Sequence, residues 1–364
     1  MKLKEVISYF ESIAPLNSQE SYDNSGLLIG ESETEIRAIL VCLDCTEEVV
    51  EEAQKLGCNL IVSHHPLIFK GLKSLTGKNY VERTVLKCIR NNISLYSIHT
   101  NLDNSIKGVN AEIGKRLGLS NLSILDPKQN VLFKLEVFVP ETNVENLSNA
   151  LYAIGVGKIG NYSDCGFFSS GTGTFRPIEN ANPTVGKLNE LSREREMKAE
   201  FLVSSHLLDA AIITMKLNHI YEEVAHNVIP LLNSNQTEGS GMIGVLPTPQ
   251  DEVTFLSHLK NTFHTGSIRH SPLLGKEIRK VAFCGGAGSF LLQNAIAMKA
   301  DVFITADFKY HEFFDADRNI LIVDIGHYES EQFTSELLVD LLKKKFTNFA
   351  VHLTGVNTNP INYF

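Results

Sequence analysis

The stretch IRAILVCLDCTEEVVEEAQKLGCNLIVSHHP, residues 36–66, contains two apolar runs of strand length separated by a segment with helical spacing. Thr46 stands at the N-cap position, and Glu47 and Glu48 fill the first turn, where acidic side chains favour the start of a helix. Gly57 follows the last residue with helical spacing, as is typical of a helix end. Strands this apolar, connected through a helix, predict a parallel sheet that helices cover on both faces.

The same alternation of strand and helix continues beyond this stretch and returns in the last third of the chain. The sequence predicts a further strand over residues 93–100, with a helix on either side of it. In the last third, strands and helices alternate from a strand over 278–284 to a final strand over 349–356. We therefore expect one α/β domain built from both ends of the chain.

The middle of the chain, from about residue 131 to 232, has a different order of elements. It reads strand, helix, Gly/Ser-rich strand, strand, helix, strand, which is the order of a ferredoxin-like α+β unit. Polar stretches on either side, DPKQN at 126–130 and NSNQTEGSG at 233–241, are typical of linkers. The predicted division is residues 1–128 and 234–364 for the α/β domain and 129–233 for the inserted domain.

Composition and charge narrow the classes of function. The chain has 364 residues, of which 43% are hydrophobic and 21% charged, as in soluble globular proteins. A net charge of -9 disfavours binding to nucleic acid, which needs a surface that neutralises phosphates. The N-terminal stretch MKLKEVISYFESIAPL lacks the features of a signal peptide, and no run reaches the ~18 apolar residues of a membrane span. We therefore expect a cytoplasmic protein with no membrane partner.

Three predicted strands in the outer thirds of the chain end in residue types that bind metals. Ligands of parallel α/β sheets collect just beyond the carboxyl ends of the strands. Imidazole and carboxylate groups from three strand ends therefore predict a metal site. The residues are His64 and His65 after one strand, His99 and Asp103 after the next, and His327 and Glu331 after a strand in the last third.

The spacing within these motifs predicts two ions. Adjacent residues in an extended segment point to opposite sides, and Pro66 favours extended backbone at His65. His64 and His65 are therefore expected to hold one ion each. On a helix, His327 and Glu331 would lie one turn apart on the same face. In that position Glu331 is placed to bridge the two ions.

Each motif taken alone has a simpler explanation. A pair of adjacent histidines is more often a surface or capping feature than a metal site, and residues such as Asp103 are ordinary turn formers. The glycine turn CGGAGSF at 284–290 could hold phosphate through its amides, but it lacks a complete P-loop or dinucleotide fingerprint, so a plain tight turn is the alternative. Its candidate substrate-binding residues are Gly285, Gly286, Gly288 and Ser289. Candidates for supporting the ligands or contacting substrate are His99, Asp307, Tyr310 and His311.

Together these segments resemble the NIF-three-like family (named for NGG-one-interacting factor three), whose bacterial members are often labelled GTP cyclohydrolase one type two homologues. The matching segments lie at both ends of the chain and in the family's order. They are DNSGLLIG (23–30), SHHP (63–66), SIHTNLD (97–103), GGAGS (285–289), ITADFKYHE (304–312) and DIGHYESE (324–331).

The resemblance implies a dinuclear metal site, a ring-shaped hexamer with its metal sites facing an internal cavity, and an inserted domain similar to the PII/CutA fold. One departure from the family is Ala306, which stands where glycine is expected and affects the geometry of that turn. The ligands implied by the resemblance are the ones that the spacing indicates: His64, His65, Asp103, His327 and Glu331.

Two functions are compatible with these residues. The first is a metal-dependent hydrolase acting on a nucleotide-like or phosphate-containing substrate, because paired divalent ions acidify water and clamp phosphates. The second is a metal-binding regulatory or assembly protein without turnover, whose insert binds an effector or gates the ring. Zinc is the expected metal, and manganese or iron also suits three histidines with two carboxylates.

Overall fold

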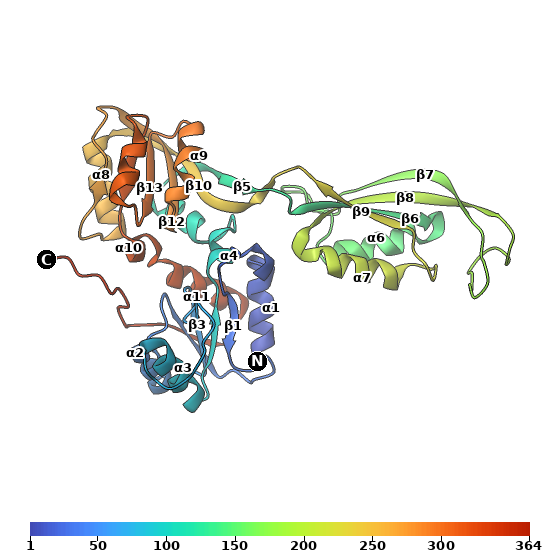
Figure 1. Cartoon of the computed structure of the whole chain (residues 1–364), viewed down its shortest axis with the longest axis horizontal. Helices are drawn as coiled ribbons and strands as arrows, with labels where there is room; N and C mark the ends of the chain where they lie inside the picture. Colours follow the sequence, from blue (N-terminus) through green and yellow to red (C-terminus); the bar gives the residue numbers. More distant parts are fainter. The chain divides into compact units, whose positions relative to one another are not determined.

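The computed structural model describes all 364 residues, which fold into two compact units (Figure 1). The first unit combines Met1–Pro127 with Thr237–Phe364, and the second consists of Lys128–Gln236. Each unit has a buried hydrophobic cluster of its own. None of the helices is both long enough and apolar enough to cross a membrane.

The first unit contains two sheets, where the sequence alone predicted a single parallel sheet. Its five-stranded sheet has the order β1-β4-β3-β2-β15, with the last four strands parallel and β1 antiparallel to β4. The strand from the far end of the chain thus completes the sheet begun by the first third. The strands are β1 (Gly26–Ile29), β2 (Ala38–Cys42), β3 (Leu60–Ser63), β4 (Ser94–Ser97) and β15 (Ala350–Leu353).

The six-stranded sheet of the first unit has the order β11-β14-β13-β12-β10-β5. Its central strands β12, β13 and β14 are parallel, while β10 is antiparallel to β12 and β11 is antiparallel to β14. Both sheets therefore have a parallel centre with at least one antiparallel strand. The strands are β5 (Ser120–Lys128), β10 (Asn235–Asp251), β11 (Arg269–His270), β12 (Glu277–Ala287), β13 (Val302–Ala306) and β14 (Leu321–Asp324).

Local sequence signals set the helix boundaries of the first unit. The helix predicted after β2 is α2. At its start the Thr46 hydroxyl accepts a hydrogen bond from the Val49 amide, and beyond its end Gly57 has a φ of +71°. The α-helices are α1 (Leu3–Ile13), α2 (Glu47–Lys55), α3 (Tyr80–Arg90), α4 (Thr100–Asp103), α5 (Val109–Arg116), α8 (Glu252–Phe263), α9 (Leu292–Ala297), α10 (His327–Glu331) and α11 (Thr334–Lys345). The short 3-10 helices are η1 (Leu16–Ser18), η4 (Ser289–Leu291) and η5 (Tyr310–Ala316).

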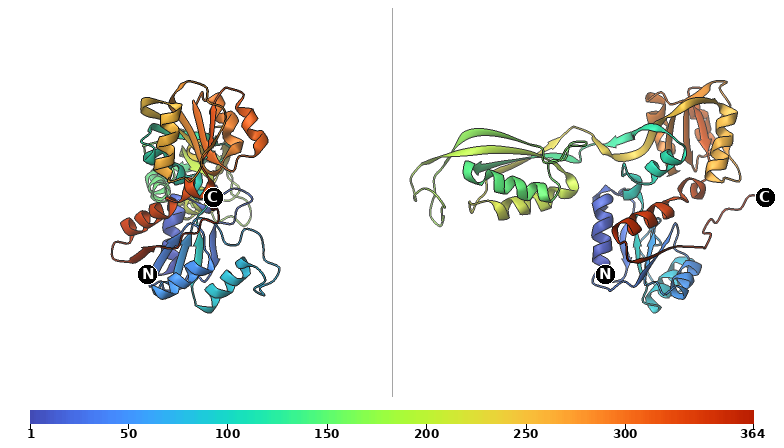
Figure 2. Two further views of the ribbon diagram at one scale, coloured as in Figure 1. Left: turned by 90° about the vertical axis from the view of Figure 1, so that its left-hand side faces the viewer. Right: turned by 180° about the vertical axis from the view of Figure 1, so that it is seen from behind.

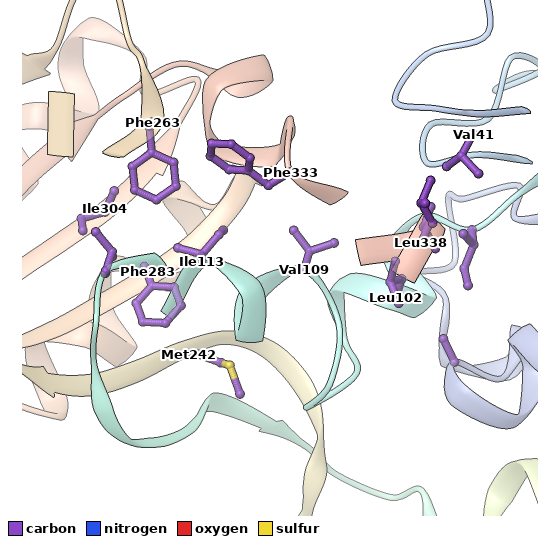
Figure 3. Close-up of a cluster of buried hydrophobic side chains, with 14 of the residues drawn as sticks. Val41, Leu102, Val109, Ile113, Met242, Phe263, Phe283, Ile304, Phe333 and Leu338 are labelled. Carbon is purple, nitrogen blue, oxygen red and sulfur yellow. The ribbon is translucent and has the colours of Figure 1, made fainter. Parts of the chain in front are cut away.

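One continuous apolar core joins the two sheets into a single unit. Figure 3 shows side chains from β2, α4 and α11 in the same cluster as side chains from α5, α8, β12 and β13. The helices between the sheets supply much of it, for example Leu102, Val109 and Ile113. Because burial of such side chains is the main driving force of folding, this core fixes the sheets relative to each other.

The second unit is an antiparallel sheet with the order β7-β8-β6-β9. Helices α6 and α7 contact each other and lie on one face of this sheet (Figures 1 and 2). Leu135, Leu147 and Phe201 belong to the core between sheet and helices. The elements are β6 (Leu132–Pro140), η2 (Glu141–Asn143), α6 (Val144–Ala153), β7 (Gly166–Phe175), β8 (Ser192–Ser204), η3 (Ser205–Leu207), α7 (Leu208–Asn218) and β9 (His226–Leu231).

The two polar stretches that were predicted as linkers are largely strand. Most of DPKQN belongs to β5 and most of NSNQTEGSG to β10, and these strands are neighbours in the six-stranded sheet. Backbone hydrogen bonding between the strands overrides the low strand propensity of their polar and glycine residues. Composition alone therefore does not identify where the chain leaves one unit and enters the next.

Removal of the second unit should leave a folded first unit. We expect this because β5 and β10 are sheet neighbours and each unit has its own core. The variant replaces residues 129–234 with a short Gly-Ser loop. Circular dichroism, gel filtration and zinc analysis should show a folded protein that binds as much zinc per chain as the full chain. Aggregation, or loss of zinc from a folded product, would contradict the expectation.

Candidate metal centre

Histidine and carboxylate side chains from both sheets of the first unit converge at the carboxyl ends of their central strands. This follows from the fold, since the residue after a buried parallel strand is the first one free to turn toward a ligand. The segments after β3 and β4 face those after β13 and β14. The residues that meet there are His64, His65, His99 and Asp103 from the first half of the chain, and Asp307, His327 and Glu331 from the second.

Glu331 is the centre of this cluster. Its Oε2 lies 2.9 Å from His65 Nε2 and 3.2 Å from His327 Nε2. The same oxygen lies 4.0 Å from His64 Nε2. The Glu331 side chain is 3% exposed, so its charge must be compensated inside the protein. One carboxylate therefore faces three imidazoles that come from two separate strand ends.

Each of the four imidazoles has its Nδ1 atom held by an oxygen. This leaves each Nε2 as the atom available to the centre, and such outer partners are what fix the tautomer and ring orientation of histidine ligands. The acceptors are the Ile98 carbonyl oxygen for His64 (2.8 Å), Asp44 for His65 (2.8 Å), Asp23 for His99 (2.8 Å) and Asp307 for His327 (2.7 Å).

The His64 Nε2 and Asp103 Oδ1 atoms face each other, and no other residue donates a hydrogen bond to either of them. His64 is fully buried, and burial lowers its pKa to about 3, so its imidazole is neutral. Because Nδ1 donates to a carbonyl, Nε2 carries the lone pair, and it lies 3.5 Å from Asp103 Oδ1. Both of these buried atoms lack a hydrogen-bond partner. Burial and the charge of Glu331 raise the pKa of Asp103, so an ionised Asp103 beside the His64 lone pair needs a positive charge, which a cation between the two atoms would supply.

His65 and His327 each lie between two carboxylates. Burial opposes their charge, but hydrogen bonds to Asp44 and Glu331 raise the pKa of His65 to about 10. For His327, Glu331 and Asp307 likewise outweigh burial and raise the pKa to about 11. The site therefore favours positive charge on this side, which protons supply and which metal ions can supply in their place.

The ligand atoms form three groups that could each hold a metal ion. Within each group the atoms lie within 4.8 Å of one another. Nitrogen and oxygen donors of this kind suit zinc, manganese or iron. The groups are His65 with His327 and Glu331, His64 with Asp103 and Glu331, and His64 with His65 and His99.

The structure brings together all five residues that the sequence indicated as ligands, but it does not point His64 and His65 to opposite sides. Their ring centroids are 4.9 Å apart, and both residues turn toward the same centre. The physical reason is that β3 ends at Ser63 and the chain bends at the two histidines, so the alternation of extended backbone no longer applies. His99 was expected to act from outside the ligand set, but it belongs to one of the three groups that could hold a metal ion.

Of the three candidates after β13, only Asp307 contacts the cluster, through its bond to His327. Tyr310 is 73% exposed on η5, and its ring contacts are with His311 and Phe314. Tyr310 also lines a separate cavity of about 540 Å³ beside β11. The structure therefore gives Tyr310 and His311 no contact with the candidate ligands. Ala306 is buried at the end of β13, and the following residue, Asp307, takes the left-handed backbone conformation (φ 58°).

The glycine turn has a steric role instead of the phosphate-binding role considered from its sequence. Its amides are already engaged within the protein, with Gly285 donating to Asn110, Gly286 to Ser330 and Gly288 to Thr305. These three amides are therefore not free for an anion, and Ser289 begins η4. A Cβ on Gly286 would lie 2.4 Å from Glu331 Oε1.

The sequence analysis missed two residues that hold histidines of the cluster, Asp44 and Asp23. Each accepts a hydrogen bond from a histidine of the cluster, and the pKa of both carboxyls is lowered because these bonds and charges outweigh burial. Asp44 follows β2, so the rule of carboxyl strand ends would have found it. Asp23 precedes β1 and carries no such signal, although it opens one of the segments that resemble the family.

The fold and the cluster define a mixed α/β protein with several sheets and with histidine and carboxylate groups that could hold a metal ion. The sequence matches Duf34/NIF3 (NGG1p interacting factor 3) over residues 1–360. The chain belongs to this family, which confirms the resemblance seen in the sequence.

Relatives of similar length support this membership. A protein of Staphylococcus epidermidis named GTP cyclohydrolase 1 type 2 homolog is 36% identical over 368 residues, which is 100% of both chains. A crystal structure of a Bacillus cereus protein related to NIF3 superposes with a TM-score of 0.86 at 37% identity, covering 100% of this chain and 99% of the other. For the Staphylococcus aureus protein SA1388 the TM-score is 0.79 at 30% identity, with the same coverage.

Proposed function

We propose that the cluster is a dinuclear metal centre in which Glu331 bridges two divalent ions. His65 and His327 would hold one ion with Glu331, and His64 and Asp103 the other. The observation that carries the proposal is the pair of buried atoms without a hydrogen-bond partner, His64 Nε2 and Asp103 Oδ1, beside the Glu331 carboxylate that His65 and His327 share. Zinc is the first choice among metals for this donor set.

We propose further that the centre hydrolyses a nucleotide-like or phosphate-containing substrate. Divalent ions would supply Lewis acidity and positive charge at this position. Asp44 and Asp307 would keep the His65 and His327 rings oriented. The His99 ring is held by Asp23 through its Nδ1 atom, and we assign its Nε2 atom to proton transfer beside the ions. A purine nucleotide is the first substrate to test, because relatives carry the name GTP cyclohydrolase 1 type 2 homolog.

A turnover screen tests this function directly. Zinc-loaded and manganese-loaded protein is incubated with GTP, other nucleotides and simple phosphoesters, and the products are separated by chromatography. We expect one substrate class to be consumed, and we expect His99→Ala to slow that reaction at least tenfold while zinc per chain stays near the wild-type value. Turnover that is absent for every substrate, with both ions bound, would contradict the hydrolase.

A regulatory role is the second candidate, and a cavity in the second unit favours it. The cavity has a volume of about 670 Å³ and is lined by β7, by the segment after it, and by the segment between α7 and β9. We propose that this unit is a ferredoxin-like, PII/CutA-like module that binds an effector, supported by its strand order β7-β8-β6-β9 with two helices on one face. Under this role, His99→Ala would change neither metal content nor assembly.

We also propose that copies of the chain assemble into a ring-shaped hexamer, as the family resemblance implies. The metal centres would then line an internal cavity that only small molecules could enter. Light scattering of the full chain at several concentrations measures the assembly. A molecular mass equal to that of a single chain at every concentration would contradict the hexamer.

A further inference from the structure

The segment that follows β15 reaches the metal centre from outside the cluster. It is first anchored on α2, where the Thr354 hydroxyl and the Gly355 amide both donate to the Glu52 carboxylate. Three residues later, the Thr358 hydroxyl donates to Asp44 Oδ2 over 2.9 Å. The other oxygen of Asp44 is the one that holds His65 Nδ1. A continuous line of hydrogen bonds therefore runs from Thr358 through Asp44 to His65.

The same segment also contacts the helix that carries the other two ligands. The Asn359 side chain donates to Glu329 Oε1 over 3.3 Å. Glu329 is buried in α10, between His327 and Glu331. A Cβ on Gly326, at the start of α10, would lie 3.2 Å from the Tyr363 oxygen, so the segment lies close against this helix start.

We propose that residues 357–363 are a positioning strap for one ion of the centre. This inference rests on the dinuclear site proposed above and assigns the strap to the group of His65, His327 and Glu331. Thr358 braces the ring of His65 through Asp44, Asn359 braces α10 through Glu329, and Tyr363 lies against the start of α10. The His64 and Asp103 side chains have no hydrogen bond to the strap, and the His64 ring is held by the Ile98 carbonyl oxygen instead.

The physical effect expected of the strap is orientation. Loss of the carboxylate that holds a histidine ligand costs ten- to a hundredfold in metal affinity, and loss of a group that orients this carboxylate is expected to act at the lower end of that range. Thr358 supplies the contact to the oxygen of Asp44 that His65 does not use. Without it, the Asp44 carboxylate can turn about its own bond, and the His65 ring can turn with it.

Zinc titration of Thr358→Val, with a competing chromophoric chelator, tests the strap. Valine keeps the shape of threonine and removes only the hydroxyl. We expect the affinity for one ion to fall about tenfold and the affinity for the other to stay unchanged. In crystals grown at limiting zinc, the anomalous signal beside His65 and His327 should weaken, while the signal beside His64 and Asp103 remains.

Two matched variants serve as controls. Thr358→Ser restores the hydroxyl and should restore both affinities. Thr354→Val removes a hydroxyl from the same segment, but its partner Glu52 contacts no candidate ligand, so zinc binding should stay at the wild-type level. If Thr358→Val binds zinc as the wild type does, loses both ions equally, or is matched by Thr354→Val, the strap is overturned and the metal centre stands. A wild type that takes up no zinc overturns the metal centre as well.

Discussion

Glu331→Gln is expected to remove both ions from the centre, although glutamine nearly matches glutamate in shape. In the proposed site Glu331 is shared, with its Oε2 facing His65, His327 and His64 at 2.9, 3.2 and 4.0 Å. The substitution takes the negative charge from between two cations, so each loses a ligand and the repulsion between them is less compensated. We expect the affinity for each ion to fall roughly a hundredfold or more.

Elemental analysis after dialysis against micromolar zinc measures this effect, and Glu252→Gln is the matched control. Glu252 is also a buried glutamate of the first unit, and it accepts the Leu274 and Gly275 amides instead of facing the cluster. Its substitution should lower the free energy of unfolding and leave two zinc ions per chain. Retention of two ions in Glu331→Gln would exclude the bridging role.

Single histidine variants distinguish two explanations for the loss of both ions in Glu331→Gln. Either Glu331 is shared by two ions, or the whole site is weakened. If the two ions have different histidines, His64→Ala should preferentially empty the position beside Asp103, and His65→Ala the position beside His327. Anomalous diffraction on both variants distinguishes the positions. Loss of the same ion in both variants would instead favour the grouping in which His64, His65 and His99 share one ion.

The candidate ligands could be predicted from sequence because each one lies in a segment that follows an apolar strand. His64, His65 and His327 are short-range features of this kind, and parallel strands bring their carboxyl ends to one edge of a sheet. The partition into two sheets could not be predicted in the same way. It depends on β15 pairing with β2 and on β5 pairing with β10, which come from different halves of the chain. The residue pattern within a strand does not identify the strand with which it pairs.

The outer partners of the ligands illustrate the same limit. His99 and Asp23 are 76 residues apart in sequence, yet their side chains meet at 2.8 Å. Thr358 and Asp44 are separated by 314 residues. Each of these residues is unremarkable in its own segment, and only the tertiary fold brings the pairs together. Residue types near strand ends thus indicate candidate ligands, whereas the groups that orient them appear only in three dimensions.

The second large effect is expected at the glycine turn. Gly286→Ala should disrupt the metal centre although it replaces none of the candidate ligands. Gly286 has φ +62°, a conformation that costs an L-residue about 1–2 kcal/mol. Its new Cβ would lie 2.4 Å from Glu331 Oε1 and 3.2 Å from His327 Cε1. The Glu331 side chain cannot easily move away, because His65 and His327 hold its other oxygen.

Gly57→Ala separates the cost of the left-handed backbone conformation from the cost of the clash with Glu331. Gly57 has a similar φ of +71°, but no atom lies within 4 Å of the position its Cβ would take. We expect Gly57→Ala to lower the free energy of unfolding by about 1 kcal/mol and to retain both zinc ions. Gly286→Ala should lower it by about 2–4 kcal/mol, since overpacking adds to the backbone cost, and should weaken zinc binding more than tenfold. Chemical denaturation and zinc titration of both variants measure this difference. Equal zinc affinity in the two variants would mean that Glu331 tolerates the crowding and that the glycine serves the turn alone.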